Sequence, residues 1–202
     1  SDKTYSKVHE RPADESAPIA LNYTSGTTGR PKGVVYHHRG TYLEAVGNII
    51  GWPLPPRAVY LWTLPLFHCN GWCFPWSVTA VGGTHVCLRA VDPAVIFPMI
   101  AEHGVTHMCG APTVLSMLTN APAEQRRRFA QPVDIQTGGS PPPAKVIKAM
   151  EELGFGEGRP CRGSGGRAVT VDARRRNHEP ARAAHAHPDD AEILAGGTLA
   201  HL

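Results

Sequence analysis

The sequence predicts an α/β domain in which a mainly parallel sheet is layered with helices, over residues 18–155 of the 202-residue chain. Short apolar runs bounded by Gly, Pro, Asn or Asp indicate strands, and segments with apolar residues at helical spacing lie between them. Strand and helix signals alternate throughout, as in sheets whose parallel strands are joined by helices. Such sheets bind ligands beyond the carboxyl ends of their strands, so we expect a site at that edge.

Each element follows from a local pattern. Buried strands are predicted at residues 19–24, 58–64, 84–88, 106–109 and 133–136. Helices are predicted from about Gly40, from a start formed by Asp92 as the cap and Pro93 as the first residue, and at 113–120 and 143–153. Pro98 falls inside the second of these helices, where proline costs about 3 kcal/mol, so we expect that helix to be short or bent.

Composition and charge exclude several classes of protein. A hydrophobic share of 42% and a charged share of 18% are typical of a globular domain and exclude disorder of the whole chain. The net charge of +3 is too small to indicate nucleic acid or an anionic membrane as the partner. No uninterrupted apolar run of about 18 residues exists, which argues against a transmembrane segment. The first ten residues lack the apolar core of a secretory signal, so a cytoplasmic location is expected.

The five cysteines are an odd number in mostly apolar surroundings, which indicates reduced, buried thiols rather than a disulfide framework. His68, Cys69, Cys73 and His85 could be considered as zinc ligands, but no pair of cysteines has the CxxC spacing that structural sites usually use. We therefore interpret these residues as part of the core and expect no bound zinc.

Residues 156–202 differ in composition from the rest of the chain. They contain none of the 14 aromatic residues, seven Arg, no Lys and only six Leu, Ile, Val or Phe. Such a segment lacks the apolar residues for a packed core, and we expect a disordered tail. Its Gly, Ala, Arg, Pro and His content is typical of a GC-rich gene translated out of frame, although a natural disordered tail has a similar composition. An Arg-rich nucleic-acid arm is disfavoured because six acidic residues are interspersed.

A loop rich in glycine and hydroxyl residues follows the first predicted strand. Gly26, Gly29 and Gly33 allow tight turns that direct backbone N–H groups at an anion. Thr24, Ser25, Thr27 and Thr28 add hydroxyl donors, and Lys32 adds a positive charge. The loop therefore predicts a cradle for the phosphates of a nucleoside triphosphate. It is not a Walker P-loop, because Pro31 precedes Lys32 and Gly33 follows it.

The segment 23–34 resembles the signature of the adenylate-forming (AMP-binding) superfamily, which includes acyl-CoA synthetases, firefly luciferase and peptide-synthetase adenylation domains. Residues 64–74 are similar to a second conserved block, in the form found in the fatty-acyl-CoA ligase branch. Residues 137–142 resemble the loop beside the adenine. The three blocks occur in the family's order, and the resemblance covers about residues 18–155, a partial adenylation domain after a polar lead-in at 1–17.

The resemblance implies a function. Members of the family activate a carboxylic acid with ATP and Mg to an acyl-adenylate and then usually pass the acyl group to CoA. It implies catalytic roles for His68 and Lys32. Nucleotide binding is implied for Thr24, Ser25, Gly26, Thr27, Thr28, Gly29, Lys32, Gly138, Gly139 and Ser140, and an acyl pocket for His68, Asn70, Trp72 and Phe74. A core position is an equally good interpretation of Trp72 and Phe74.

Several parts of the family pattern are absent from this sequence. It lacks the Tyr-Gly-x-Thr-Glu block that engages phosphate and Mg, the aspartate that binds the ribose, and the C-terminal domain with its catalytic lysine. The sequence therefore predicts a fragment of an acyl-CoA ligase that is inactive by itself and does not supply the Mg ligand. Two alternatives remain open: a nucleotide-binding remnant without catalysis, and a truncated product that does not fold.

Overall fold

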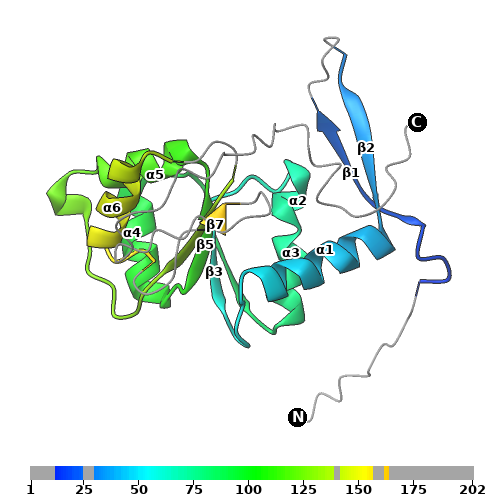
Figure 1. Cartoon of the computed structure of the whole chain (residues 1–202), viewed down its shortest axis with the longest axis horizontal. Helices are drawn as coiled ribbons and strands as arrows, with labels where there is room; N and C mark the ends of the chain where they lie inside the picture. Colours follow the sequence, from blue (N-terminus) through cyan, green and yellow to red (C-terminus); the bar gives the residue numbers. More distant parts are fainter. Residues whose placement is uncertain (1–11, 25–29, 139–141, 157–161, 164–202) are drawn as a thin grey trace, which may run out of the picture.

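A computed structural model describes residues 12–24, 30–138, 142–156 and 162–163 (Figure 1). Its main body is a five-stranded sheet in the order β4-β3-β5-β6-β7, in which every neighbouring pair is parallel. The strands are β3 (Val59–Trp62), β4 (Thr84–Cys87), β5 (His107–Gly110), β6 (Asp134–Thr137) and β7 (Arg162–Gly163). The predicted fold class is confirmed, and four of the predicted strands lie within two residues of their expected positions.

Helices cover the two faces of the sheet (Figure 1). On one side lie α4 (Pro93–His103), α5 (Pro112–Thr119), α6 (Ala144–Glu152) and, next to α4, the short 3-10 helix η1 (Ala123–Gln125). On the other side lie α1 (His38–Gly51), the one-turn element α2 (Cys69–Trp72) and α3 (Phe74–Ala80). The result is the helix–sheet–helix layering that the alternating sequence pattern predicts.

Each face of the sheet has its own apolar core, because successive residues of a strand point to opposite faces. Leu61 and Met108 belong to the cluster under α4, α5 and α6. Tyr60 and Cys109, next to them in the chain, belong to the cluster under α1 and α3. The side chains of β3 and β5 therefore alternate between the two clusters, so these strands pack against the helices on both faces of the sheet.

Helix α4 begins as predicted. The Asp92 carboxylate accepts a hydrogen bond from the N–H of Ala94 at 2.8 Å, and Pro93 occupies the first turn. The helix runs on past Pro98 to His103, so the proline does not end it, and the expected bend stays a prediction. Fully buried side chains on both sides of the proline, at Ile96 and Ile100, hold the helix on the sheet despite the missing backbone donor.

The first predicted strand is present, but it is not buried and it does not join the parallel sheet. β1 (Pro18–Thr24) pairs in antiparallel register with β2 (Lys32–His37), a strand that the sequence analysis did not predict. Leu21 is 55% and Tyr23 is 67% exposed. The helix expected from about Gly40 begins at His38, where the His37 ring accepts a hydrogen bond from the N–H of Gly40. The hairpin of β1 and β2 projects from the body (Figure 1).

Most of the predicted tail lies outside the described residues. The exceptions are Gly156 and the short strand β7, which continues the sheet beside β6 and which the tail composition did not suggest. Over the described residues, none of the helices combines the length and the apolar character needed to span a bilayer.

Candidate functional site

The hairpin fixes the two ends of the predicted phosphate loop. Thr24, the last residue of β1, is in register with Lys32, the first residue of β2, and both are exposed. A Cβ at Gly33 would lie 3.1 Å from the Leu21 side chain, so a larger residue there would have to displace that side chain by a few tenths of an ångström. The structure therefore presents one hydroxyl and one ammonium group together at the mouth of the loop, while Ser25, Gly26, Thr27, Thr28 and Gly29 lie outside the described residues.

The other two predicted blocks begin at one edge of the parallel sheet. Residues 64–74 follow β3, and Gly138 follows β6, so both leave from carboxyl ends of strands. The Thr63 hydroxyl donates to the Cys109 carbonyl and so ties the end of β3 to the end of β5. Gly138 is buried, and Gly139 and Ser140 lie outside the described residues. This is the edge at which the fold class predicts ligand binding.

The block after β3 contains an unusual turn. Residues 69–73, here called the left-handed turn, all have positive φ, from +48° at Cys69 to +61° at Cys73, and only Gly71 among them lacks a side chain. Left-handed helical backbone costs about 1–2 kcal/mol for each residue that has a Cβ. Strain of this kind persists where the surrounding structure over-determines the backbone, and it is concentrated at functional sites.

The predicted pocket residues differ in exposure. His68 precedes the left-handed turn and is exposed, whereas Asn70 and Trp72 within the turn are half-buried. Phe74 is fully buried in the core, where its ring stacks on Tyr60 at 5.1 Å between centroids. The structure therefore places His68 at the surface directly before the turn, Asn70 and Trp72 partly inside it, and Phe74 in the core behind them.

The left-handed turn also contacts the hairpin whose two strands frame the predicted phosphate loop. α2 packs against β1, and the Tyr36 phenol of β2 lies beside the Cys69 thiol. Burial, followed by the nearby thiols of Cys69 and Cys73, raises the pKa of Tyr36 above its ordinary value. Tyr36 therefore stays protonated, and its phenol O–H remains a hydrogen-bond donor between the hairpin of β1 and β2 and the turn.

The interior side of the left-handed turn disfavours negative charge. Burial, the nearby Glu44 carboxylate and Cys69 raise the pKa of Cys73 to about 12. Burial also raises the pKa of Glu44 itself. Cys73 is therefore a neutral thiol in the core, as the sequence analysis expects for cysteines in this region. Cys87 differs, because it is exposed.

A protein-held metal has no donor set in the part of the chain that the structure describes. No group of three or more His, Cys, Asp or Glu side chains is placed there to bind one ion. The combination of His68, Cys69, Cys73 and His85 is therefore not a zinc site within the described residues. Mg that accompanies ATP is bound mainly by phosphate oxygens and one or two carboxylates, and the sequence analysis places the family's protein ligand in the Thr-Glu block that is not found among these residues.

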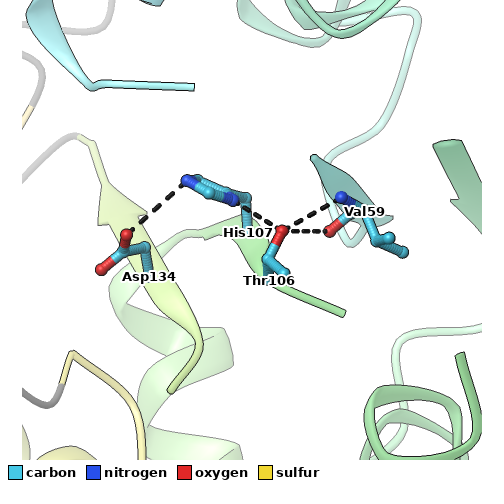
Figure 2. A network of polar contacts seen from close by, with 4 residues as sticks. All are labelled: Val59, Thr106, His107 and Asp134. Carbon is cyan, nitrogen blue, oxygen red and sulfur yellow. Dashed lines mark hydrogen bonds and ion pairs between the residues drawn. The ribbon is translucent and has the colours of Figure 1, made fainter. Parts of the chain in front are cut away.

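A buried polar network lies at the opposite, amino end of β5 (Figure 2). The Thr106 hydroxyl accepts from the N–H of Val59 at 3.0 Å and donates to its carbonyl at 3.2 Å, and it lies 2.8 Å from Nδ1 of His107. Nε2 of His107 is 3.6 Å from the Asp134 carboxylate. This network joins β3, β5 and β6 at the edge away from the candidate site, so we assign it to the fold.

The family model of the AMP-binding enzymes matches residues 1–166. The chain belongs to this family. Among similar proteins, the 2-methylpropanoate–CoA ligase of Humulus lupulus is 54% identical over 144 residues, which are 71% of this chain and 26% of that protein. The acetate/butyrate–CoA ligase of Arabidopsis thaliana, described as peroxisomal, is 52% identical over 145 residues, again 71% and 26%. The chain thus spans about a quarter of the length of the curated relatives it matches.

Solved structures of adenylate-forming enzymes have the same fold. o-Succinylbenzoate CoA synthetase of Bacillus subtilis, in complex with ATP and magnesium, matches with a TM-score of 0.58 at 30% identity, over 70% of this chain and 29% of that one. The N-terminal domain of FACL13 from Mycobacterium tuberculosis matches with a TM-score of 0.62 at 26% identity, over 72% and 37%. The family resemblance read from the three sequence blocks is therefore confirmed.

Sequence analysis missed two residues that hold the left-handed turn in place. Asn48 of α1 donates from its side chain to the carbonyl of Trp72 at 2.8 Å. Trp62 of β3 lies against Gly71. These partners are far apart in the sequence, and an asparagine in a helix or a tryptophan in a strand gives no local signal of such a role.

Proposed function

We propose that this chain is part of an ATP-dependent acid–CoA ligase, in which a carboxylic acid is activated to an acyl-adenylate and the acyl group is passed to CoA. The observation that carries the proposal is the packing of α2 against β1, which brings the left-handed turn to the hairpin of the predicted phosphate loop. The names of the relatives, which are acid–CoA ligases, support the same reaction class.

The phosphate loop would bind the triphosphate of ATP. Attack of a carboxylate on the α-phosphate forms the acyl–phosphate bond and expels pyrophosphate, on which negative charge develops. Lys32 and the hydroxyl of Thr24, fixed side by side at the end of the hairpin, would stabilise that charge together with the loop between them. Gly138, Gly139 and Ser140 would lie against the adenine, where side chains are small or absent.

His68 would orient the carboxylate. Its side chain is exposed at the carboxyl edge of the sheet, next to the left-handed turn, and an imidazole N–H is a suitable donor to a carboxylate oxygen. Asn70 and Trp72 would line the acyl pocket from the same turn. Phe74 would shape the pocket only from behind, through the aromatic cluster in which it is buried.

Nucleotide binding tests this proposal directly. We expect ATP and AMP to bind in a saturable manner, measured by calorimetry, and Lys32→Ala to weaken ATP binding by about 10- to 100-fold, because a charge-assisted hydrogen bond is lost. Lys148→Ala is the matched control, since Lys148 is an exposed lysine on α6. Equal affinity of the Lys32 variant and the wild-type protein would refute the phosphate cradle.

We further propose that residues 1–202 do not complete the reaction by themselves, because the Tyr-Gly-x-Thr-Glu block of the family is not found among them. A pyrophosphate-release assay with ATP, CoA and butyrate, 2-methylpropanoate or trans-cinnamate should give only background. Turnover above background would contradict this part. Binding without turnover would favour the alternative of a nucleotide-binding remnant. Absence of a cooperative melting transition would favour a chain that does not fold.

Two further expectations remain proposals. A cytoplasmic location is our prediction, although some relatives are described as peroxisomal, and fractionation of cells would decide. The boundary of the tail at residue 156 is also a prediction, and the family model matches up to residue 166. Translation of the other two frames of the gene beyond Phe155 tests an out-of-frame origin, which predicts a Tyr-Gly-x-Thr-Glu block in one of them.

A further inference from the structure

The left-handed turn rests on the indole of Trp62. A Cβ at Gly71 would lie 2.5 Å from Cζ3 and 3.1 Å from Cη2 of that ring, so the backbone of the turn touches the indole directly. Trp62 is the last residue of β3 and only 7% exposed. The place of the indole ring therefore determines where the backbone of the turn can lie.

His85, on the neighbouring strand β4, holds this indole. Nε1–H of Trp62 donates to Nδ1 of His85 at 3.0 Å, and the two rings are stacked with 14° between their planes. The other ring nitrogen, Nε2, is 3.1 Å from the Thr79 hydroxyl. Thr79 gives its own proton to the Pro75 carbonyl at 2.6 Å, so its oxygen accepts from Nε2–H. Both nitrogens are satisfied when the imidazole is neutral.

The network surrounds the turn from two sides. Trp62 lies under Gly71, and Pro75 and Thr79 belong to α3, the helix that follows the turn directly. We propose that His85 is a positioning residue that fixes the left-handed turn through Trp62 and α3, and with the turn the side chains of His68 and Asn70. The proposal rests on the proposed function, in which those side chains face the substrate.

Hydrogen exchange of backbone amides, measured by NMR, tests the proposal without requiring activity. In His85→Ala we expect the amides of residues 69–73 to exchange about tenfold faster, because the acceptor that holds the indole is lost. The amides of β5 should keep their wild-type rates. His85→Gln should restore most of the protection, because its amide offers one acceptor and one donor. His103→Ala, which changes a histidine in the last turn of α4, is the matched control and should change nothing at the turn.

Two results would overturn the role of His85: unchanged exchange at residues 69–73 in His85→Ala, or an equal acceleration at β5, which would show general destabilisation. If His85→Ala does not fold, the wild-type protein decides, because the Trp62 indole N–H must then be protected from exchange, and a freely exchanging indole would refute the proposal. AMP titration of the same samples distinguishes a failure of the proposed function from a failure of the role of His85. If the wild-type chain binds no AMP, the proposed function fails, whereas the exchange data still settle the role of His85.

Discussion

The imidazole of His107 and the carboxylate of Asp134 lie 3.6 Å apart as register partners on β5 and β6. His107 is only 3% exposed, and Trp52 packs on its ring with 5.0 Å between centroids. Because the pair is buried at the amino edge of the sheet, away from the candidate site, we expect it to contribute to stability and not to ligand binding.

Asp134→Asn should lower the free energy of unfolding by about 1–3 kcal/mol, because the negative charge 3.6 Å from the buried imidazole is removed. Urea unfolding followed by circular dichroism measures this change. Asp92→Asn is the matched control, since asparagine also caps helices well and should leave α4 and the overall stability almost unchanged. Equal effects of the two substitutions would contradict the assignment of the His107 pair to the fold.

Two buried threonines at the carboxyl edge should respond to substitution in opposite directions. Thr137 is 4% exposed, and its hydroxyl has no hydrogen-bond partner among the described residues. Thr63 is 5% exposed, and its hydroxyl donates to the Cys109 carbonyl. Thr137→Val should therefore raise the free energy of unfolding by about 1 kcal/mol, and Thr63→Val should lower it by a similar amount. Thermal melting shows whether each variant gains or loses stability. A loss of stability in both variants would argue against a Thr137 hydroxyl without a hydrogen-bond partner among the described residues.

Gly71→Ala should be more damaging than Gly82→Ala. Both glycines have positive φ, near +60°, but a Cβ at Gly71 meets the Trp62 ring whereas a Cβ at Gly82 meets nothing within 4 Å. Gly82→Ala should lower the free energy of unfolding by only about 1–2 kcal/mol, the cost of holding alanine in the left-handed conformation. Gly71→Ala should lower it by about 1–3 kcal/mol more, because the indole must move. Denaturant unfolding of both variants gives the difference, and equal costs would show that the indole yields freely.

Cysteine modification should follow burial and pKa. The reactive form is the thiolate, and the raised pKa of Cys73, about 12, together with the raised pKa of buried Cys109, keeps both as thiols at pH 8. Iodoacetamide should therefore label exposed Cys87 before Cys73 and Cys109, as read by peptide mass spectrometry. As the pH rises above about 9, the unfolded chain ionises these buried thiols before the folded chain does, so the stability they contribute at lower pH should be lost.

The sequence predicted the parallel sheet well, because short runs with buried apolar residues and a capped helix such as that at Asp92 are local signals. It did not predict that β1 leaves the sheet to pair with β2. The apolar residues Ile19 and Leu21 look alike in a buried strand and in an exposed hairpin, since only partners from elsewhere decide their burial. Lys32 and Thr24 were identified through their loop, but their register pairing depends on the hairpin and could not be read from composition.

In the candidate site, too, residues with a local sequence signal could be predicted and residues that act through distant partners could not. His68 and Asn70 could be named as candidate site residues because they belong to a recognisable block. His85, Asn48 and Trp62 were missed, since each acts on that block from another strand or helix, and a fold is needed before such partners meet. The left-handed backbone at residues 69–73 was also unforeseen, because only one of its five residues is glycine.

The pairing pattern determines the order in which the parts of the chain can assemble. The two strands of the hairpin are close in sequence, and such a hairpin closes within about 1–10 μs. Residues Val59 and Thr106, which join β3 to the start of β5, are 47 positions apart, and parallel strands so distant come together much more slowly. The frame of the phosphate loop can therefore form and dissolve many times before the sheet is complete. It becomes permanent only when the turn after β3 arrives to pack against it.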